Sequence, residues 1–285
     1  MVGAPLKKWF ENRGYAAGDD LYLYDKDASK GFLGNVNNAD IIFVSVPSPR
    51  LPDGSADISI VDGVIARIDS SRSGSKIVVI KSTVPPGTTA ELQKKYPWHK
   101  ILFNPEFLTE KNAWNDFINP DRQLVGWTEV SRDAAKNVLE LLPKARLMSP
   151  SNELDVSATE AEIIKYAANV FLARKVTFAN AIHGLARYHQ ANFDNIRKAL
   201  GADPRIGHSH LDVHHSGYMG YGGYCFVKDT DALIAHFEKL GLLEAAALFH
   251  RDRKFNEVLL AEQGLTPEDV SMHDHEWIKR RVDKK

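Results

Sequence analysis

Three short apolar runs in the first half of the chain predict buried strands, at residues 40–46, 76–80 and 100–103. Runs in which nearly every residue is apolar are typical of parallel strands that are covered on both faces of a sheet. Residues 60–68, between the first two runs, follow the period of a helix, so strand, helix and strand alternate. This alternation predicts an α/β fold with a doubly wound parallel sheet. We also expect a strand at 21–25, a short last strand at 124–127 and a helix at 132–142.

Long helical segments replace this alternation after about residue 150. Ser157 and Glu160 have the spacing of a capping box, and a helical pattern continues from there to His183 without glycine or proline, extending to about Gln190. Such a long helix favours a central spine or a contact between two subunits. Further helices are expected at 194–200, 229–240 and 243–262. The sequence therefore predicts a sheet domain at 1–150 and a helical domain at 151–285.

Composition narrows the class of protein. The 285 residues include 44% apolar residues, enough for a sizeable core, and 36 Lys and Arg nearly balance 37 Asp and Glu. This balance argues against nucleic acid or an anionic membrane as a partner. We find no signal peptide and no apolar run of about 18 residues that could span a bilayer. One cysteine cannot form an intramolecular disulfide, so we expect a cytoplasmic protein in a reducing environment.

The only cysteine, Cys225, lies in the glycine-rich stretch from Gly220 to Thr230. Glycine adopts backbone conformations that are closed to other residues and lets a substrate approach closely. Lys228 and the start of the helix expected after it favour a thiolate over a thiol, as a nucleophile requires. A thiol buried in a tight turn is an equally good interpretation, because cysteine is among the most buried residue types. The segment by itself leaves both interpretations open.

The beginning of the chain has part of a dinucleotide-binding pattern. Gly3 opens a predicted helix, and about twenty residues later an apolar stretch ends in Asp25. The last glycine of G-x-G-x-x-G and the carboxylate that holds the ribose hydroxyls have this spacing in a βαβ unit. The first two glycines and the strand before them are absent from the sequence. A flexible start at Gly3 and a turn residue at Asp25 fit the pattern equally well.

Other candidate residues follow the predicted strands. Ligands of a doubly wound sheet bind beyond the carboxyl ends of its strands, which here are the loops 47–49 and 82–83. The loop after the third strand carries Glu106 and Glu110. Acids on solvated loops are common, so these two residues alone decide nothing.

Three polar residues share one face of the long predicted helix. Glu162, Lys165 and Asn169 stand at i, i+3 and i+7. A solvated stripe is the alternative, but the residues around these three are mostly apolar, which favours a buried face.

A group of histidines raises the question of a metal site. His208, His210, His214, His215 and His236 lie within thirty residues of one another. No zinc spacing with cysteine is present, and Asp212 is the only acid near the first four. We therefore predict no metal.

Five motifs occur in a fixed order along the chain. They are Val46-Pro47-Ser48-Pro49 with Asp53-Gly54, Lys81 to Gly87, Asn104 to Leu108 with Pro120-Asp121-Arg122, Glu162 through Lys165 to Asn169, and Gly220 to Thr230. In this order they resemble the UDP-glucose/GDP-mannose dehydrogenase family, whose members oxidise the C6 alcohol of a nucleotide sugar to a carboxylate with two NAD. The resemblance implies a Rossmann-like NAD-binding domain at 1–150, a helical central domain at 151–285, NAD as cofactor and UDP-glucose as the default substrate.

The resemblance also implies roles for individual residues. In the family's mechanism a thiolate adds to an aldehyde intermediate, and by position Cys225 would be that nucleophile, with Lys165 and Asn169 facing the oxyanion. Asp229 and Thr83 match positions used for proton transfer through water, and Glu106 is a further catalytic candidate on the loop that approaches the sugar. The residues assigned to the substrate are Glu110, Phe107, Leu108, Arg205, Tyr221 and Gly222. Those assigned to NAD are Gly3, Val2, Asp25, Val46, Pro47, Ser82, Thr83 and Lys228.

A homodimer joined through the helix at 157–190 is also implied, because Arg205 matches an arginine that in the family reaches the substrate of the neighbouring subunit. The sequence departs from the family in three ways: the first strand is missing, the segment from Asp25 to Ala39 is shorter than is usual in the family, and the C-terminal domain that holds much of the nucleotide has no counterpart after about Glu262. Two alternatives therefore stay open. One is a degenerate protein that binds a nucleotide sugar without turnover. The other is a two-electron hydroxyacid dehydrogenase, which has no use for Cys225.

Overall fold

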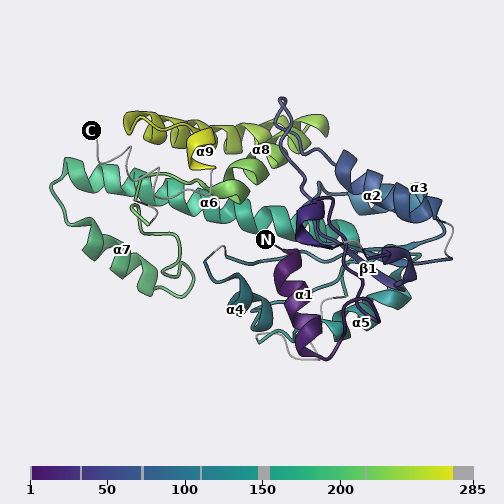
Figure 1. The fold of residues 1–285 in the computed structure, drawn as a ribbon. Coiled ribbons are helices and arrows are strands. Elements are labelled where there is room, and N and C mark those ends of the chain that lie inside the picture. The colour runs from purple at the N-terminus through teal and green to yellow at the C-terminus, as the bar shows by residue number, and fades with distance from the viewer. Residues whose placement is uncertain are drawn as a thin grey trace. The chain divides into compact units, whose positions relative to one another are not determined.

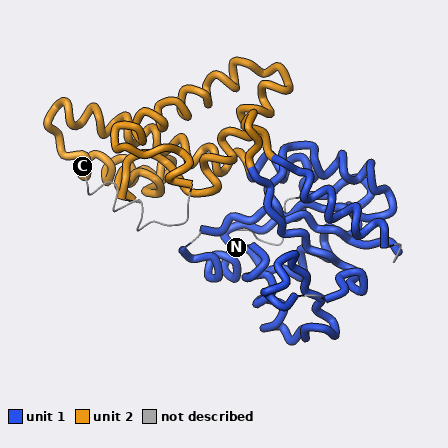
Figure 2. Tube along the Cα trace, turned by 45° about the horizontal axis from the view of Figure 1, so that its top comes forward, with its two compact units in different colours: residues 1–49, 57–165 blue, residues 50–56, 166–285 orange. Residues whose placement is uncertain are grey.

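The computed structural model describes residues 2–32, 34–71, 74–109, 111–146, 155–215 and 217–271. The chain forms two compact units, coloured separately in Figure 2. The first comprises Met1–Pro49 and Asp57–Lys165, and the second comprises Arg50–Ala56 and Tyr166–Lys285. The predicted domain boundary at residue 150 lies outside the described residues.

A three-stranded parallel sheet forms the centre of the first unit. Its strands are β1 (Ile41–Val44), β2 (Ile77–Ile80) and β3 (Lys100–Phe103), in the order β1-β2-β3. The register aligns Ile41 with Ile77 and Ile77 with Lys100. The three apolar runs are therefore confirmed as parallel strands, although the first strand ends two residues before the run does.

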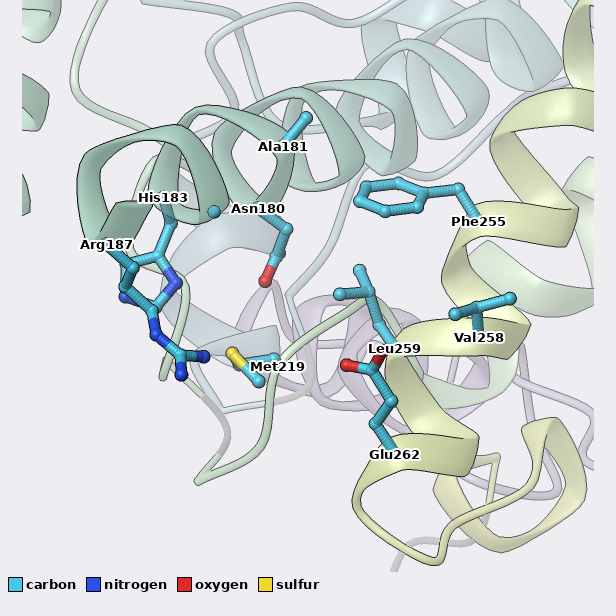
Figure 3. Close-up of a pocket in the computed structure, with 10 residues that line it drawn as sticks. Asn180, Ala181, His183, Arg187, Met219, Phe255, Val258, Leu259 and Glu262 are labelled. Atoms are coloured by element: carbon cyan, nitrogen blue, oxygen red, sulfur yellow. The ribbon is translucent and has the colours of Figure 1, made fainter. Parts of the chain in front are cut away.

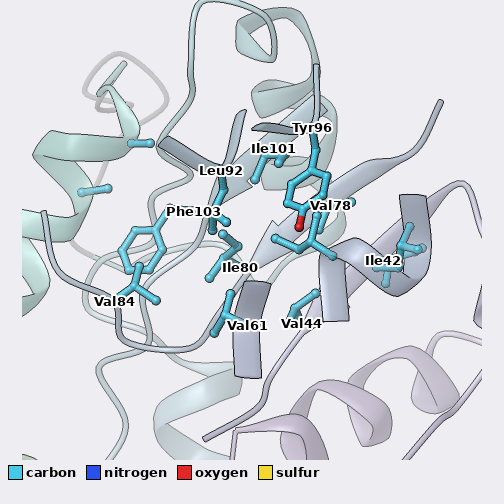
Figure 4. Close-up of a cluster of buried hydrophobic side chains, with 14 of the residues drawn as sticks. Ile42, Val44, Val61, Val78, Ile80, Val84, Leu92, Tyr96, Ile101 and Phe103 are labelled. Carbon is cyan, nitrogen blue, oxygen red and sulfur yellow. The ribbon is translucent and has the colours of Figure 1, made fainter. Parts of the chain in front are cut away.

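Helices cover both faces of this sheet, which confirms the doubly wound fold. Alternate strand residues point to opposite sides. Ile42, Val44, Val78, Ile80, Ile101 and Phe103 pack with α2 (Ser59–Ser70), α3 (Thr88–Lys95) and the first turn of α6 (Ala158–Tyr188), as Figure 4 shows in part. Ile41, Phe43, Ile77, Val79 and Leu102 pack with α1 (Gly3–Asn12), α4 (Ala113–Ile118) and α5 (Arg132–Leu141). Burial on two sides is the reason why the strands contain so few polar residues.

The strand predicted at 21–25 is wrong. The described part of this segment forms isolated bridges and turns, followed by the short 3-10 helices Ala28–Lys30 and Val36–Asn38. The N–H of Asp25 donates to the carbonyl of Phe32, and the N–H of Gly34 donates to that of Leu23. The segment thus pairs locally, and no strand of the sheet takes its backbone hydrogen bonds, which a strand requires.

The last strand predicted at 124–127 is also wrong, because only single bridges form there, between Phe103 and Gly126 and between Trp127 and Ser157. The start of α6 packs directly on this segment. A Cβ on Gly126 would lie 2.7 Å from the Cβ of Ala161 and 2.8 Å from the Cα of Ala158. The glycine is thus required for this close approach.

The second unit is helical, as predicted. It contains most of α6, then α7 (Phe193–Ala202), α8 (Gly223–Lys239), α9 (Leu243–Glu262) and α10 (Pro267–Val270) (Figure 1). The capping box at the start of α6 is confirmed: the N–H of Glu160 donates to Ser157 Oγ, and the N–H of Ser157 donates to Glu160 Oε2. The helix expected at 229–240 begins six residues earlier than predicted, because the glycine turn that starts it lies at Gly220–Gly223.

A hairpin at 50–56 belongs to this second unit, although the chain on either side of it belongs to the first. Arg50 Nε lies 2.5 Å from Asp231 Oδ2 on α8, and Arg253 Nε of α9 lies 2.8 Å from Asp231 Oδ1. Burial raises the pKa of Asp231, and the two arginines offset part of that rise. Two cations therefore hold one buried carboxylate beside the hairpin.

Among the described residues, no helix combines the length and the apolar character needed to cross a membrane.

Candidate active site

Lys165 and Glu106 form an ion pair in the first unit, in which the lysine is buried and the glutamate is half-buried. The side chain of Lys165, near the start of α6, is 4% exposed. Its Nζ donates to the carbonyl oxygen of Glu106 at 2.6 Å and to Glu106 Oε1 at 2.9 Å. The loop after β3 therefore carries Glu106 to the lysine, as the position of this loop at the carboxyl edge of the sheet predicts.

A second lysine adds positive charge to this pair. Lys81 follows β2 and is buried, and its Nζ donates to Asn104 Oδ1 at 2.5 Å. Burial lowers the pKa of Lys81 to about 8, while the negative charge of Glu106 raises it and Lys165 lowers it further. Burial would raise the pKa of Glu106, but the charge and the hydrogen bond of Lys165 outweigh burial, so that this pKa is lowered.

Glu162, one turn before Lys165, has a different partner. Its Oε2 accepts from the N–H of Gly87 at 2.6 Å, and its Oε1 accepts from the N–H of Thr89 at 2.8 Å and from Thr89 Oγ1 at 2.6 Å. These groups form the N-terminus of α3, where N–H groups lack partners within the helix. Burial nevertheless raises the pKa of Glu162 to about 7. Glu162 thus serves as a cap for α3.

The predicted polar face of α6 is confirmed as a buried one: Glu162 and Lys165 are buried and Asn169 is half-buried, while the neighbouring Ile163 is 50% exposed. On this part of α6 the polar side chains face inward and an apolar one faces outward. The polar side chains find hydrogen-bond partners in segments far away in the sequence, and buried polar groups need such partners.

Asn169 belongs to the second unit and binds the carboxylate of Asp229. Asn169 Nδ2 donates to Asp229 Oδ2 at 2.6 Å, and Lys228 Nζ donates to Asp229 Oδ1 at 2.5 Å. The Asp229 side chain is 1% exposed and that of Lys228 is 8% exposed. A cation and an amide donor therefore satisfy the buried carboxylate from two sides.

Cys225 lies in the first turn of α8, one helical turn before Asp229, and is half-buried. Gly220 and Gly223 have φ of +98° and +74°, which side chains other than glycine rarely adopt. No acidic residue occupies the first turn of α8, and its N-cap residue, Gly222, provides no side-chain hydrogen bond. A helix N-terminus without an acidic residue or a side-chain cap favours an anion such as a thiolate.

Four of the residues expected to hold a dinucleotide, Val46, Pro47, Ser82 and Thr83, lie in the loops that follow β1 and β2. Ser82 Oγ donates to the carbonyl of Val46 at 2.6 Å and accepts from the N–H of Val46 at 2.9 Å. Ser48 Oγ donates to the carbonyl of Thr83 at 2.6 Å. The two loops are thus joined, with Pro47 exposed between them and Thr83 half-buried.

Comparison with known proteins identifies the family. Residues 26–142 match the NAD binding domain of the UDP-glucose/GDP-mannose dehydrogenase family, and residues 159–258 match its central domain. A UDP-glucose 6-dehydrogenase from Rhizobium meliloti is 36% identical over 227 residues, which are 76% of this chain and 51% of that protein. The structure of a UDP-glucose dehydrogenase from Pyrobaculum islandicum superposes with a TM-score of 0.69 at 30% identity, over 92% of this chain and 69% of that one. The chain belongs to the UDP-glucose/GDP-mannose dehydrogenase family.

Membership of this family makes NAD the cofactor, because the matched domain is an NAD-binding domain. A UDP-D-ManNAc dehydrogenase from Pyrococcus horikoshii shares the fold, with a TM-score of 0.70 at 19% identity over 92% of this chain and 68% of that one. The chain spans about half the length of the curated relatives it matches, 46% and 51% for two of them.

Part of the first unit fits the dinucleotide that this family binds. The first turn of α1, entered through Val2 and Gly3, has neither an acidic residue nor a side-chain cap, so its N–H groups suit a phosphate. A Cβ on Gly3 would lie 3.8 Å from the Cβ of Ser45, which places the start of α1 beside the end of β1. Asp25 fits less directly, because its carboxylate binds Lys30 at 2.7 Å, and this hydrogen bond lowers the pKa of Asp25.

The remaining family-derived positions are spread over the chain. Phe107 is half-buried and lies under the guanidinium of Arg122, 3.8 Å from the ring centroid, and the N–H of Leu108 binds Glu106 Oε2. Arg205 is exposed and binds Asp203. Tyr221 is buried, and burial raises the pKa of its hydroxyl. A Cβ on Gly222 would lie 2.0 Å from Tyr218 Oη. Glu110 lies outside the described residues.

A cavity of about 380 Å³ in the second unit is not lined by any of the predicted site residues. Side chains of α6 and α9 and that of Met219 line it (Figure 3), among them Asn180, His183, Arg187, Leu259 and Glu262. Within the described ranges, no three histidine, cysteine, aspartate or glutamate residues are grouped as a metal ion would require.

The sequence interpretation assigned no role to Lys81 and Asn104, which lie in the motifs quoted for the family. One signal could have indicated Lys81: it directly follows a buried strand, where side chains reach the ligand edge of the sheet. Asn104 holds the same position after β3.

Proposed function

We propose that the protein catalyses the NAD-dependent oxidation of the C6 alcohol of a nucleotide sugar to the carboxylate, with UDP-glucose as the default substrate and Cys225 as the nucleophile. The observation that carries the proposal is the start of α8. There Cys225 precedes by one turn a buried carboxylate, Asp229, which Asn169 and Lys228 hold in place. A hydroxyacid dehydrogenase that transfers two electrons has no use for a cysteine in this position.

The proposed chemistry balances as four electrons per sugar. NAD accepts a hydride in each of two oxidations. After the first, the Cys225 thiolate adds to C6 of the aldehyde, forming a C–S bond, and the oxygen takes a proton. The second oxidation converts this thiohemiacetal into a thioester. Water then adds to C6, the C–S bond breaks, and the thiolate leaves as the carboxylic acid is released and ionises.

The polar residues have separate tasks in this scheme. Lys165 and Asn169, one turn apart on α6, stabilise the oxyanion that develops at C6, with Glu106 orienting Lys165. Asp229 and Thr83 are each assigned to proton transfer through water, by their match to the family's positions. Phe107, Leu108, Glu110, Arg205, Tyr221 and Gly222 contact the nucleotide sugar. Val2, Gly3, Asp25, Val46, Pro47, Ser82, Thr83 and Lys228 contact NAD.

The decisive experiment measures NADH formed per sugar consumed with UDP-glucose, UDP-N-acetylmannosamine and GDP-mannose. Two NADH per molecule of one sugar would support the proposal and name the substrate. One NADH per sugar would indicate a two-electron dehydrogenase. No NADH with any of them, together with measurable sugar binding, would indicate a binding protein without turnover.

Cys225→Ser tests the nucleophile directly. We expect acid formation to fall by at least about a thousandfold, while oxidation to the aldehyde stays measurable, because only the later steps need the thiolate. Intact-mass analysis of the unsubstituted protein during turnover should detect an acyl group on this residue. Acid formation by the variant at the original rate would remove Cys225 from the mechanism.

We also propose that the protein forms a homodimer through the helix at 157–190. Phe171, Phe178 and Leu185 of α6 repeat every seven residues and are 63%, 52% and 56% exposed. Such a repeat places apolar side chains on one side of a helix. Sedimentation velocity should show a dimer for the unchanged chain and a monomer for Phe178→Asp. Arg187→Asp, an exposed position nine residues after Phe178 and so on the opposite side of the helix, is the control. A monomeric unchanged chain would contradict the proposal.

A further inference from the structure

Two amide side chains of the α9 region bind the loop that precedes Cys225. Asn256 Oδ1 accepts from the N–H of Tyr221 at 2.6 Å, and its Nδ2 donates to the carbonyl of the same residue at 2.9 Å. Gln263 binds Met219 in the same way, with its Oε1 accepting at 2.8 Å and its Nε2 donating at 2.9 Å. Each amide thus pairs with both backbone groups of one loop residue.

The spacing of the four residues accounts for this pattern. Asn256 and Gln263 are seven residues apart, about two helical turns, and so lie on one side of α9 and its C-cap. Met219 and Tyr221 lie on either side of Gly220, where the backbone bends with a φ of +98°. The two amides therefore hold the backbone on both sides of this bend.

The glycine between these two residues shows how closely the loop lies against α9. A Cβ on Gly220 would lie 2.6 Å from Asn256 Oδ1, and its φ is +98°. Asn256 is only 2% exposed. Tyr218 adds an apolar contact to the same region, because it packs with Leu260 of α9 and with Leu265 and Val270. Backbone and side-chain contacts thus both join the loop to the α9 region, four residues before Cys225.

We propose that Asn256 and Gln263 are positioning residues for Cys225. They fix the glycine loop from which α8 begins, and the orientation of the first turn of α8 fixes the direction of the thiol. The inference rests on the proposed role of Cys225 as the nucleophile. Neither amide contacts the reacting atoms in this scheme. Their contribution is to keep the cysteine in one orientation, which an enzyme that forms a covalent intermediate requires.

The test uses the fact that Cys225 is the only cysteine. An alkylating reagent that carries a trifluoromethyl group labels this residue alone, and its fluorine NMR spectrum reports the surroundings of the side chain. We compare the unchanged chain with Asn256→Ala and Gln263→Ala. Arg251→Ala, an exposed position on α9, is the control. All spectra are recorded well below the lowest midpoint of thermal unfolding.

The unchanged chain and the control should each give one sharp resonance. Asn256→Ala should give a second resonance or a line broadened about threefold, since a loop without its partner exchanges between conformations, and Gln263→Ala should have a smaller effect. A lower midpoint of unfolding with an unchanged single resonance would show a merely structural role and overturn the proposal. If Asn256→Ala does not fold, Asn256→Asp carries the test, because it keeps the acceptor for Tyr221 and loses the donor.

The fluorine spectrum does not depend on turnover, because the label occupies the thiol. If the protein has no dehydrogenase activity, the proposed function is contradicted, but the spectra still show whether Asn256 and Gln263 hold Cys225 in one orientation. Where turnover is measurable, Asn256→Ala should lower kcat by a larger factor than it raises KM for the sugar, since the residue positions the nucleophile and also holds Tyr221, which is assigned to the sugar.

Discussion

Two glutamates of the first unit, the half-buried Glu106 and the buried Glu162, have opposite pKa shifts. Lys165 donates to Glu106, and the pKa of that carboxyl is lowered despite burial. Glu162 accepts three hydrogen bonds, but all come from neutral groups at the start of α3, and burial raises its pKa to about 7. The comparison teaches that in this unit the neutral donors of α3 do not outweigh the effect of burial on the pKa, whereas the charge and hydrogen bond of Lys165 do.

The difference separates a candidate for chemistry from a structural residue. The pair of Lys165 and Glu106 adjoins Lys81, whose pKa of about 8 leaves it exchanging a proton just above neutral pH. Such a group of charges suits a site where negative charge develops. Glu162 belongs to a helix cap. Both glutamates would look alike to any argument from residue type alone.

The largest expected loss of stability comes from removing the positive charge of Lys165 beside Glu106. Lys165→Met should lower the free energy of unfolding by about 3 kcal/mol at pH 8, because it leaves a half-buried carboxylate without its cation. The loss should be smaller at pH 5, where Glu106 can take a proton. Urea denaturation at both pH values measures it, and in turnover kcat should fall about a hundredfold, more than KM rises.

The exposed pair of Lys95 and Asp62, 2.6 Å apart, provides the matched control. Lys95→Met should cost less than about 1 kcal/mol at either pH, since exposed pairs contribute little. Equal losses in the two variants would mean that burial does not distinguish the pairs, and the contrast between the two glutamates would fail.

Glu162→Gln should flatten the dependence of stability on pH. The folded carboxyl binds its proton more tightly than the unfolded one. Its contribution to stability is therefore complete below about pH 4.5 and is lost as the pH rises through about 7. The loss amounts to about 3 kcal/mol for a shift of this size. Denaturation between pH 5 and 8 should show a smaller slope for the variant, and parallel curves would contradict the raised pKa.

The smallest effect should come from one of the neutral donors. Thr89→Val removes the hydroxyl that binds Glu162 Oε1, at a cost of about 1 kcal/mol near pH 8 and less near pH 5. Thr88→Val is the control, because the hydroxyl of Thr88 donates to the carbonyl of Pro85 and not to Glu162. A loss in Thr88→Val that depends on pH to the same extent would show that the hydroxyl of Thr89 has no special effect on the carboxyl.

The sequence predicted those features that depend on local pattern. The three strands were found because residues such as Val79 and Ile80 point to opposite faces that are both buried. The inward face of α6 was found from the spacing of Glu162, Lys165 and Asn169. The strand at 21–25 was wrong because its apolar pattern cannot show whether a neighbouring strand is available to pair with it.

Partners that lie far apart in the sequence could not be predicted. Glu162 binds residues 73 and 75 positions before it, and Asn256 binds a residue 35 positions before it. Nothing in the sequence shows that Glu162 binds the start of α3 whereas Lys165, on the same face of α6, binds Glu106. The resemblance supplied the positions of the candidate site, and the structure supplied what each side chain touches.

The hairpin at 50–56 has a consequence for how genes of this kind can recombine. The chain leaves the first unit at Arg50, returns at Asp57 and leaves it again after Lys165, so neither unit is one continuous stretch of a gene. A recombination event that exchanged the segment before residue 166 would also exchange Arg50, the partner of Asp231. A new hairpin that lacked this arginine would leave Asp231 with only Arg253 to neutralise it. The hairpin at 50–56 is thus constrained to evolve with the second unit, although it is encoded between two parts of the first.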